Sequence, residues 1–125
     1  MILIETKRLL LREFEIGDIP RIIQYSKEET KQKELPDEIF DTYSKAANQV
    51  EMCINNYKEK KYPLVYAMVL KETNTFIGDV LLCPIQDGVE IGYFVSEKYQ
   101  GNGYATEAIK AFAPWAKDTL HINLV

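Results

Sequence analysis

The stretch from Val89 to Lys117 constrains the fold most, because three kinds of structure follow one another within it. Residues 89–95 are rich in β-branched and aromatic side chains, a composition typical of a strand. Residues 100–103 include two glycines, which interrupt both strands and helices. From Tyr104 onward, apolar residues recur at helical spacing. The sequence therefore predicts a strand, a glycine-bearing loop and a helix in direct succession.

This succession favours a binding site for an anion. The first N–H groups of a helix lack intrahelical acceptors and lie at the positive end of the helix dipole. Glycine has no Cβ atom, so a phosphate group can approach the main chain of Gly101 and Gly103 closely. Residues 100–106 are therefore predicted to bind a pyrophosphate. The alternative is a plain strand-to-helix connection that needs its glycines for the turn alone.

Two familiar phosphate-binding loops do not match this stretch. A P-loop requires Lys and then Ser or Thr after its last glycine, whereas Gly103 is followed by Tyr104 and Ala105. A dinucleotide fingerprint requires a third glycine where Thr106 stands, and an acidic residue on a second strand about 20 residues later. The earlier part of the chain also lacks the pattern of repeated βαβ units.

A third motif does match. Gln100-Gly101-Asn102-Gly103-Tyr104-Ala105 resembles the Gln/Arg-x-x-Gly-x-Gly/Ala signature of the GCN5-related N-acetyltransferases (GNAT). The flanking segments 90–93 and 105–108, and the opening segment 6–12, are similar to the branch that acetylates ribosomal-protein N-termini. The resemblance implies an N-acetyltransferase domain over residues 1–125. It would move an acetyl group from acetyl-CoA to a primary amine, on a protein N-terminus or a small molecule.

The resemblance also implies the site residues. Glu90 lies ten positions before Gln100, where many family members carry a catalytic glutamate, and is the predicted general base, acting directly or through a water. A solvent-facing strand glutamate is the alternative interpretation. A β-bulge is expected near Phe94 and Val95, whose main chain would bond the pantetheine arm. The implied cofactor-binding positions are Phe94, Val95, Gln100, Gly101, Asn102, Gly103, Tyr104, Ala105 and Thr106.

The remaining pattern predicts an α+β fold. Strands are expected over residues 4–14, 64–71, 75–82 and 89–95, and helices over 19–25, 41–60 and from 104. The strands from 64 to 95 are joined by short turns, as in an antiparallel meander. Together with the resemblance, this predicts a GNAT-like mixed, mostly antiparallel sheet flanked by helices.

The family's fold continues past the strand that begins at residue 122, with one more helix and two more strands. The resemblance therefore implies a domain incomplete at its C-terminus. An open sheet edge at residues 122–125 would favour pairing with a second copy of the chain, as a homodimer. The alternative function is a non-catalytic remnant that binds acyl-CoA or dimerises.

The composition argues against several classes of binding partner. The net charge of −4 argues against a general nucleic-acid-binding surface. No run of 18 apolar residues is present, and Met1–Glu5 is too short and acidic for a signal peptide. Cys53 and Cys83 are isolated and lack metal-ligand spacing. The sequence thus predicts a cytoplasmic enzyme without a metal, a nucleic-acid partner or a membrane partner.

Overall fold

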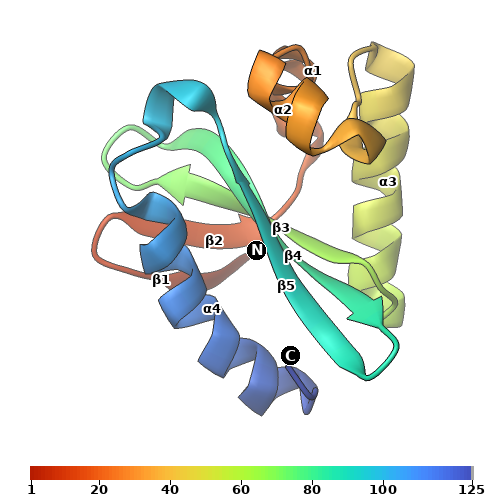
Figure 1. The fold of residues 1–125 in the computed structure, drawn as a ribbon, viewed down its shortest axis with the longest axis vertical. Helices are drawn as coiled ribbons and strands as arrows, with labels where there is room; N and C mark the ends of the chain where they lie inside the picture. Colours follow the sequence, from red (N-terminus) through yellow and green to blue (C-terminus); the bar gives the residue numbers. More distant parts are fainter. Residues whose placement is uncertain (125) are drawn as a thin grey trace.

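Five antiparallel strands form one sheet in the computed structural model, which describes residues 1–124 (Figure 1). The strands lie side by side in the order of the sequence; short turns join most neighbouring pairs, whereas residues 14–63, which contain three α-helices, connect the second strand to the third. They are β1 (Ile2–Glu5), β2 (Leu9–Glu13), β3 (Leu64–Leu70), β4 (Thr75–Ile85) and β5 (Gly88–Val95). The predicted α+β class and antiparallel meander are confirmed.

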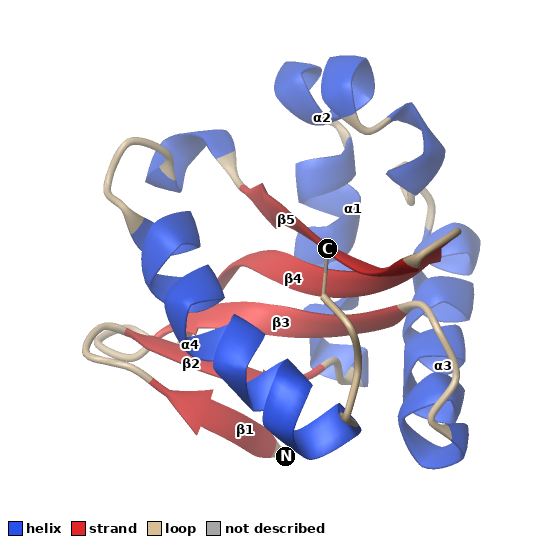
Figure 2. Cartoon of the chain, turned by 60° about the horizontal axis from the view of Figure 1, so that its bottom comes forward, coloured by secondary structure: helices blue, strands red, loops and turns tan. Residues whose placement is uncertain are grey.

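Helices cover both faces of this sheet (Figure 2). One face carries α4, and the opposite face carries α1 and α3, with α2 beyond the end of β5. The helices are α1 (Ile19–Ser26), α2 (Glu29–Glu34), α3 (Tyr43–Glu59) and α4 (Tyr104–Leu120), and short 3-10 turns span Ile16–Asp18, Pro36–Glu38 and Glu97–Tyr99. Within residues 1–124, no helix is both long and apolar enough to cross a membrane.

Each face of the sheet has its own hydrophobic core. Phe112 of α4 packs in the cluster that contains Met68 of β3. Tyr25 of α1 and Val50 of α3 pack in the other cluster, with Phe76 of β4. Successive strand residues point to opposite faces, so the same strands supply both cores. This double burial explains why β3 reads as a nearly continuous apolar run.

The N-terminal strand differs from the prediction. Instead of one strand over residues 4–14, the chain forms a hairpin of β1 and β2 that turns at Thr6–Arg8. The Glu107 carboxylate of α4 accepts hydrogen bonds from Thr6 Oγ1 at 2.6 Å and from Arg8 N at 2.9 Å. The turn therefore depends on a side chain about a hundred residues away, which no local pattern indicates.

Strand β4 is longer than predicted. Cys83 and Pro84 were expected to end it, but β4 continues to Ile85 and stays paired with β5. Strand β3 begins opposite Leu82 of β4, so Pro84 has no β3 neighbour. The missing N–H of a proline is tolerated where no neighbouring strand needs it.

Strands β4 and β5 approach each other tightly at Gly78, which lies opposite Val95. A Cβ atom at Gly78 would lie 2.0 Å from the carbonyl oxygen of Phe94. We expect Gly78→Ala to lower the free energy of unfolding by about 2 kcal/mol, because the added methyl forces the strands apart. Urea denaturation measures this loss. Gly17→Ala is the control, since a Cβ there meets nothing within 4 Å; equal losses in both variants would contradict the prediction.

Candidate functional site

The loop before α4 has the geometry that the glycines predict. Gly101 and Gly103 both have φ of +79°, in the left-handed region that favours glycine. The first helical hydrogen bond of α4 runs from Glu107 N to Gly103 O at 3.0 Å. The N–H groups of Tyr104, Ala105 and Thr106 therefore have no intrahelical acceptor and are available to an anion.

Side chains hold this loop in place from within. Gln100 Nε2 donates to Val95 O at 2.9 Å, and Asn102 Nδ2 donates to Tyr99 O at 3.1 Å. From outside the loop, Arg8 Nη1 donates to Asn102 O at 2.9 Å. The amide side chains of Gln100 and Asn102 thus bond main-chain oxygens, and the N–H groups at the start of α4 stay available as donors.

A pocket of about 380 Å³ lies against these N–H groups. We call it the large pocket; its walls are the end of β5, residues 99–106 and the helix α2. Of the nine predicted cofactor-binding positions, all except Asn102 line it. Helix α2 adds Thr30, Lys31 and Glu34, and Leu35 follows directly after the helix; the motif did not indicate these residues. The structure therefore brings most of the predicted positions together around one space.

The bulge expected near Phe94 and Val95 lies elsewhere. Strand β5 pairs with β4 in a continuous register from Gly88 to Val95. The register shift lies in β4, where Ile77 has no partner on β3. Beside this shift, the absent side chain of Gly78 lets the Phe94 carbonyl approach β4 closely.

Two carboxylates join the start of α2 to residues 96–97, which lead into the glycine loop, and each accepts hydrogen bonds from the other's segment. Glu28 accepts from Ser96 Oγ at 2.6 Å and from Glu97 N at 3.0 Å. Glu97 in turn accepts from Thr30 N at 3.0 Å and from Thr30 Oγ1 at 2.6 Å. These hydrogen bonds lower the pKa of Glu97. The exchange positions α2 as a wall of the large pocket, and no sequence pattern indicated it.

Glu107 lies in the first turn of α4, where a negative charge opposes anion binding. Its carboxylate is held by the N-terminal hairpin, through Thr6 and through Arg8 Nε at 2.6 Å. Burial raises the pKa of Glu107, but the hydrogen bonds from Thr6 and Arg8 outweigh it and lower the pKa. The ion pair with Arg8 compensates this charge beside the site.

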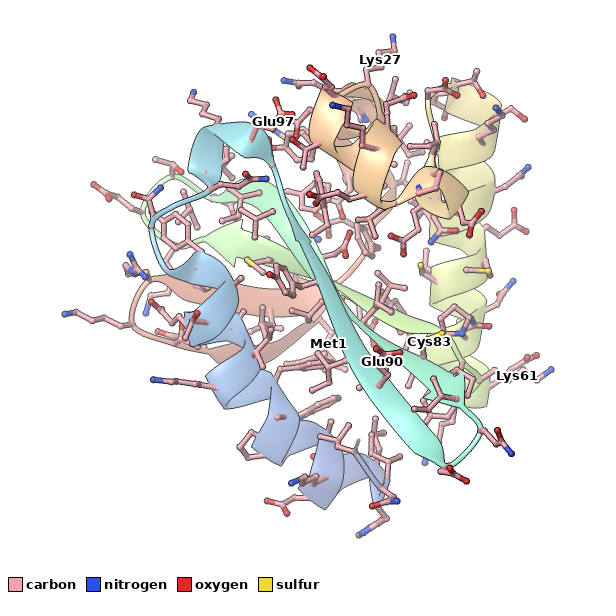
Figure 3. All side chains as sticks on the ribbon, viewed as in Figure 1. Met1, Lys27, Lys61, Cys83, Glu90 and Glu97 are labelled. Carbon is pink, nitrogen blue, oxygen red and sulfur yellow. The ribbon has the colours of Figure 1, made fainter. Side chains whose placement is uncertain are left out.

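Glu90 lies outside the walls of the large pocket. It is exposed on β5, opposite Cys83 of β4, and shares a face of the sheet with Phe94 four residues further on. Four strand residues span roughly 13 Å. Figure 3 shows Glu90 on β5 at a distance from Glu97, which marks the end of β5 near the loop. The catalytic role of Glu90 stays a prediction.

Together, the fold and the site define a class of protein: an antiparallel α+β domain in which a helix with free N–H groups at its start follows the edge strand. The chain belongs to the acetyltransferase (GNAT) domain family, whose model matches residues 8–125. The family therefore accounts for nearly the whole chain, including the glycine loop and α4.

Individual relatives agree with this assignment. The chain is 26% identical over 127 residues to the uncharacterised N-acetyltransferase YnaD of Bacillus subtilis, covering 98% of this chain and 69% of that one. A GNAT-family acetyltransferase structure from Bacillus anthracis aligns with a TM-score of 0.77 at 24% identity, over 99% of this chain and 71% of that one. The structure of a ribosomal L7/L12 α-N-protein acetyltransferase in complex with coenzyme A aligns with a TM-score of 0.74 at 19% identity. The alignment covers 94% of this chain and 69% of that chain.

Proposed function

We propose that this chain transfers the acetyl group of acetyl-CoA to a primary amine. The observation that carries the proposal is the large pocket, where free N–H groups at the start of α4 follow two glycines of positive φ. Such N–H groups bind phosphate oxygens, and CoA contains a pyrophosphate. Family membership, and two relatives that are named N-acetyltransferases, support the same reaction.

In this proposal the cofactor lies along the end of β5. The pyrophosphate would bind the main chain of residues 103–106, and the pantetheine arm would follow Phe94 and Val95. Strand β5 is the last strand of the sheet, and on its outer side Val89 forms an isolated bridge to Leu124. We propose that the outer main-chain groups of β5 beyond this bridge bond the amides of the arm.

The reaction requires a neutral amine. Its nitrogen forms a bond to the acetyl carbon, the carbon–sulfur bond breaks, and the CoA thiolate takes up a proton. An α-amino group, with a pKa near 7.7–8.0, loses its proton more readily than a lysine side chain near 10.4. Glu90 is the proposed base; because it lies outside the large pocket, it would act through a water.

The acceptor is proposed to be a protein N-terminus or a small amine. Two structural neighbours are named for acetylation of ribosomal proteins, L7/L12 in one case and the S5 alanine in the other. A protein N-terminus would also match the lower pKa that eases the reaction. Pairing of two copies through an open sheet edge at residues 122–125 stays a prediction, and Val125 lies outside the described residues.

Calorimetric titration tests the proposal. The folded chain should bind acetyl-CoA and desulfo-CoA much more tightly than ATP, because the pocket accommodates the pantetheine arm as well as phosphates. Release of the CoA thiol in the presence of primary amines then measures turnover. Absence of binding to both CoA compounds would overturn the proposal, whereas binding without turnover would favour the acyl-CoA-binding alternative.

A further inference from the structure

A second, small pocket of about 30 Å³ lies next to the large one. Phe94 and Lys31 line both pockets, so the two spaces share a wall. Aromatic rings make up much of the small pocket, and its charged members are Lys31, Glu38 and Asp79. They come from α2, the turn Pro36–Glu38 and β4, which are far apart in the sequence. The volume is enough for one small polar group.

The Lys31 ammonium is buried there without a polar partner. Lys31 is only 5% exposed, yet within residues 1–124 its Nζ takes part in no hydrogen bond or ion pair. Nζ lies 4.5 Å from the centroid of the Phe94 ring and 5.8 Å from that of Phe40. Within the described residues, every side-chain N or O atom that solvent cannot reach has a hydrogen-bond partner. Because Lys31 Nζ has no such partner, it must still be accessible from the open space of the pocket.

Two carboxyl groups face the same space. Asp79 of β4 lies opposite Phe94, and Glu38 ends the turn that follows α2. Both are half-buried, and within the described residues neither side chain makes a hydrogen bond or ion pair. Burial raises the pKa of Asp79 to about 7, although the Lys31 ammonium acts in the opposite direction. Burial also raises the pKa of Glu38.

The charges and the rings both favour a cation in this pocket. With both carboxyls ionised, two negative charges face one ammonium, which leaves a net charge of −1. Aromatic faces attract organic cations. The described residues hold no group of three or more His, Cys, Asp or Glu side chains placed to bind a metal ion. An organic ammonium therefore fits the walls better than a metal ion does.

We propose that the small pocket binds the amine acceptor as its ammonium ion, with Asp79 and Glu38 as the anionic partners; the bound ammonium passes one proton to a base before its nitrogen can attack the thioester. The inference rests on the proposed acetyltransferase function for the identity of the ligand as acceptor. Lys31 supplies an internal ammonium that competes for the same carboxylates. Because Phe94 and Lys31 line both pockets, an amine bound here lies next to the pocket proposed for the thioester.

Titration with n-butylammonium chloride tests the pocket directly. Calorimetry at pH 8 is carried out on the free chain and on the chain saturated with desulfo-CoA, with n-butanol as the uncharged comparison. Asp79→Asn should weaken n-butylammonium binding about tenfold or more, because it removes a charge-assisted hydrogen bond. Lys31→Met should strengthen binding about fivefold, because the competing ammonium is gone.

Asp37→Asn is the matched control, since Asp37 is exposed in the same turn as Glu38 and does not line the small pocket. It should bind n-butylammonium as the wild type does. Equal affinity of Asp79→Asn and wild type, no measurable binding by the wild type, or equal binding of n-butanol would each overturn the inference. Failure to bind acetyl-CoA would instead count against the proposed function, and the titration of the free chain would still decide the pocket.

The pH dependence of amine binding gives a second test. The titratable groups that face Asp79 are Lys31, Glu38, Tyr25 of α1 and Cys53 of α3. Burial raises the pKa of Tyr25, and that of Cys53 to about 12. With a pKa of about 7, Asp79 loses most of its charge between pH 8 and pH 6. Affinity for n-butylammonium should therefore fall about tenfold over this range. A wild type that binds equally at both pH values would contradict the assignment.

Discussion

Gly103→Val should weaken acetyl-CoA binding about a hundredfold. Gly103 has φ of +79°, and valine strongly disfavours this region, so the loop must change shape to accommodate it. The change displaces the N–H groups of residues 104–106, on which the proposed phosphate contacts depend. The reason is the backbone and not a collision, because a Cβ at Gly103 meets only the Arg8 guanidinium, at 3.6 Å. Calorimetric titration with acetyl-CoA measures the loss.

Two further variants separate backbone strain from the mere addition of a side chain. Gly103→Asn should retain more affinity than Gly103→Val, because asparagine tolerates the left-handed region. Gly17→Val adds the same side chain where nothing lies within 4 Å and should bind acetyl-CoA as the wild type does. Circular dichroism confirms that each variant is folded. Undiminished binding by a folded Gly103→Val would remove the phosphate-binding role of the loop.

The glycine loop was predictable because its information is local. The change from strand composition to helical spacing predicted the boundaries of β5 and the start of α4, and the two glycines predicted a loop between them. Helix α3 is a similar case. Its apolar face predicted residues 41–60, and the structure has Tyr43–Glu59, with Thr42 accepting a hydrogen bond from Lys45 N.

The rest of the site was not predictable because it depends on contacts between distant segments. The exchange of hydrogen bonds between Glu28, Thr30 and Glu97 joins α2 to the loop, and neither segment alone indicates the other. Asp79 shows the same limit. In the sequence it is one polar residue in a strand, and only the packing of α2 against β4 and β5 brings Lys31 next to it. The apolar pattern predicts which residues are buried, not which buried charges meet.

Glu90→Gln should lower kcat about a hundredfold while leaving acetyl-CoA affinity unchanged. General-base catalysis contributes roughly 10²–10⁴ in rate, and glutamine has the shape of glutamate without its basicity. Because Glu90 is exposed and lies outside the large pocket, the substitution should disturb neither the fold nor the cofactor contacts. Steady-state release of the CoA thiol gives kcat, and calorimetry gives the affinity. Unchanged kcat would remove Glu90 from the mechanism.

Comparison with Asp79→Asn distinguishes the role of the Asp79 carboxylate from that of Glu90. If Asp79 binds the acceptor's ammonium, its loss should raise KM for the amine more than it lowers kcat, whereas loss of the base should act mainly on kcat. Asp87→Asn is the control for Glu90→Gln, because Asp87 is an exposed carboxylate in the turn between β4 and β5 that lines neither pocket. If Asp79→Asn lost much of its kcat and Glu90→Gln lost none, the proton acceptor would be Asp79 in the small pocket and not Glu90 on the exposed part of β5. The motif spacing alone does not distinguish these positions, because it locates Glu90 on β5 but contains no information about β4.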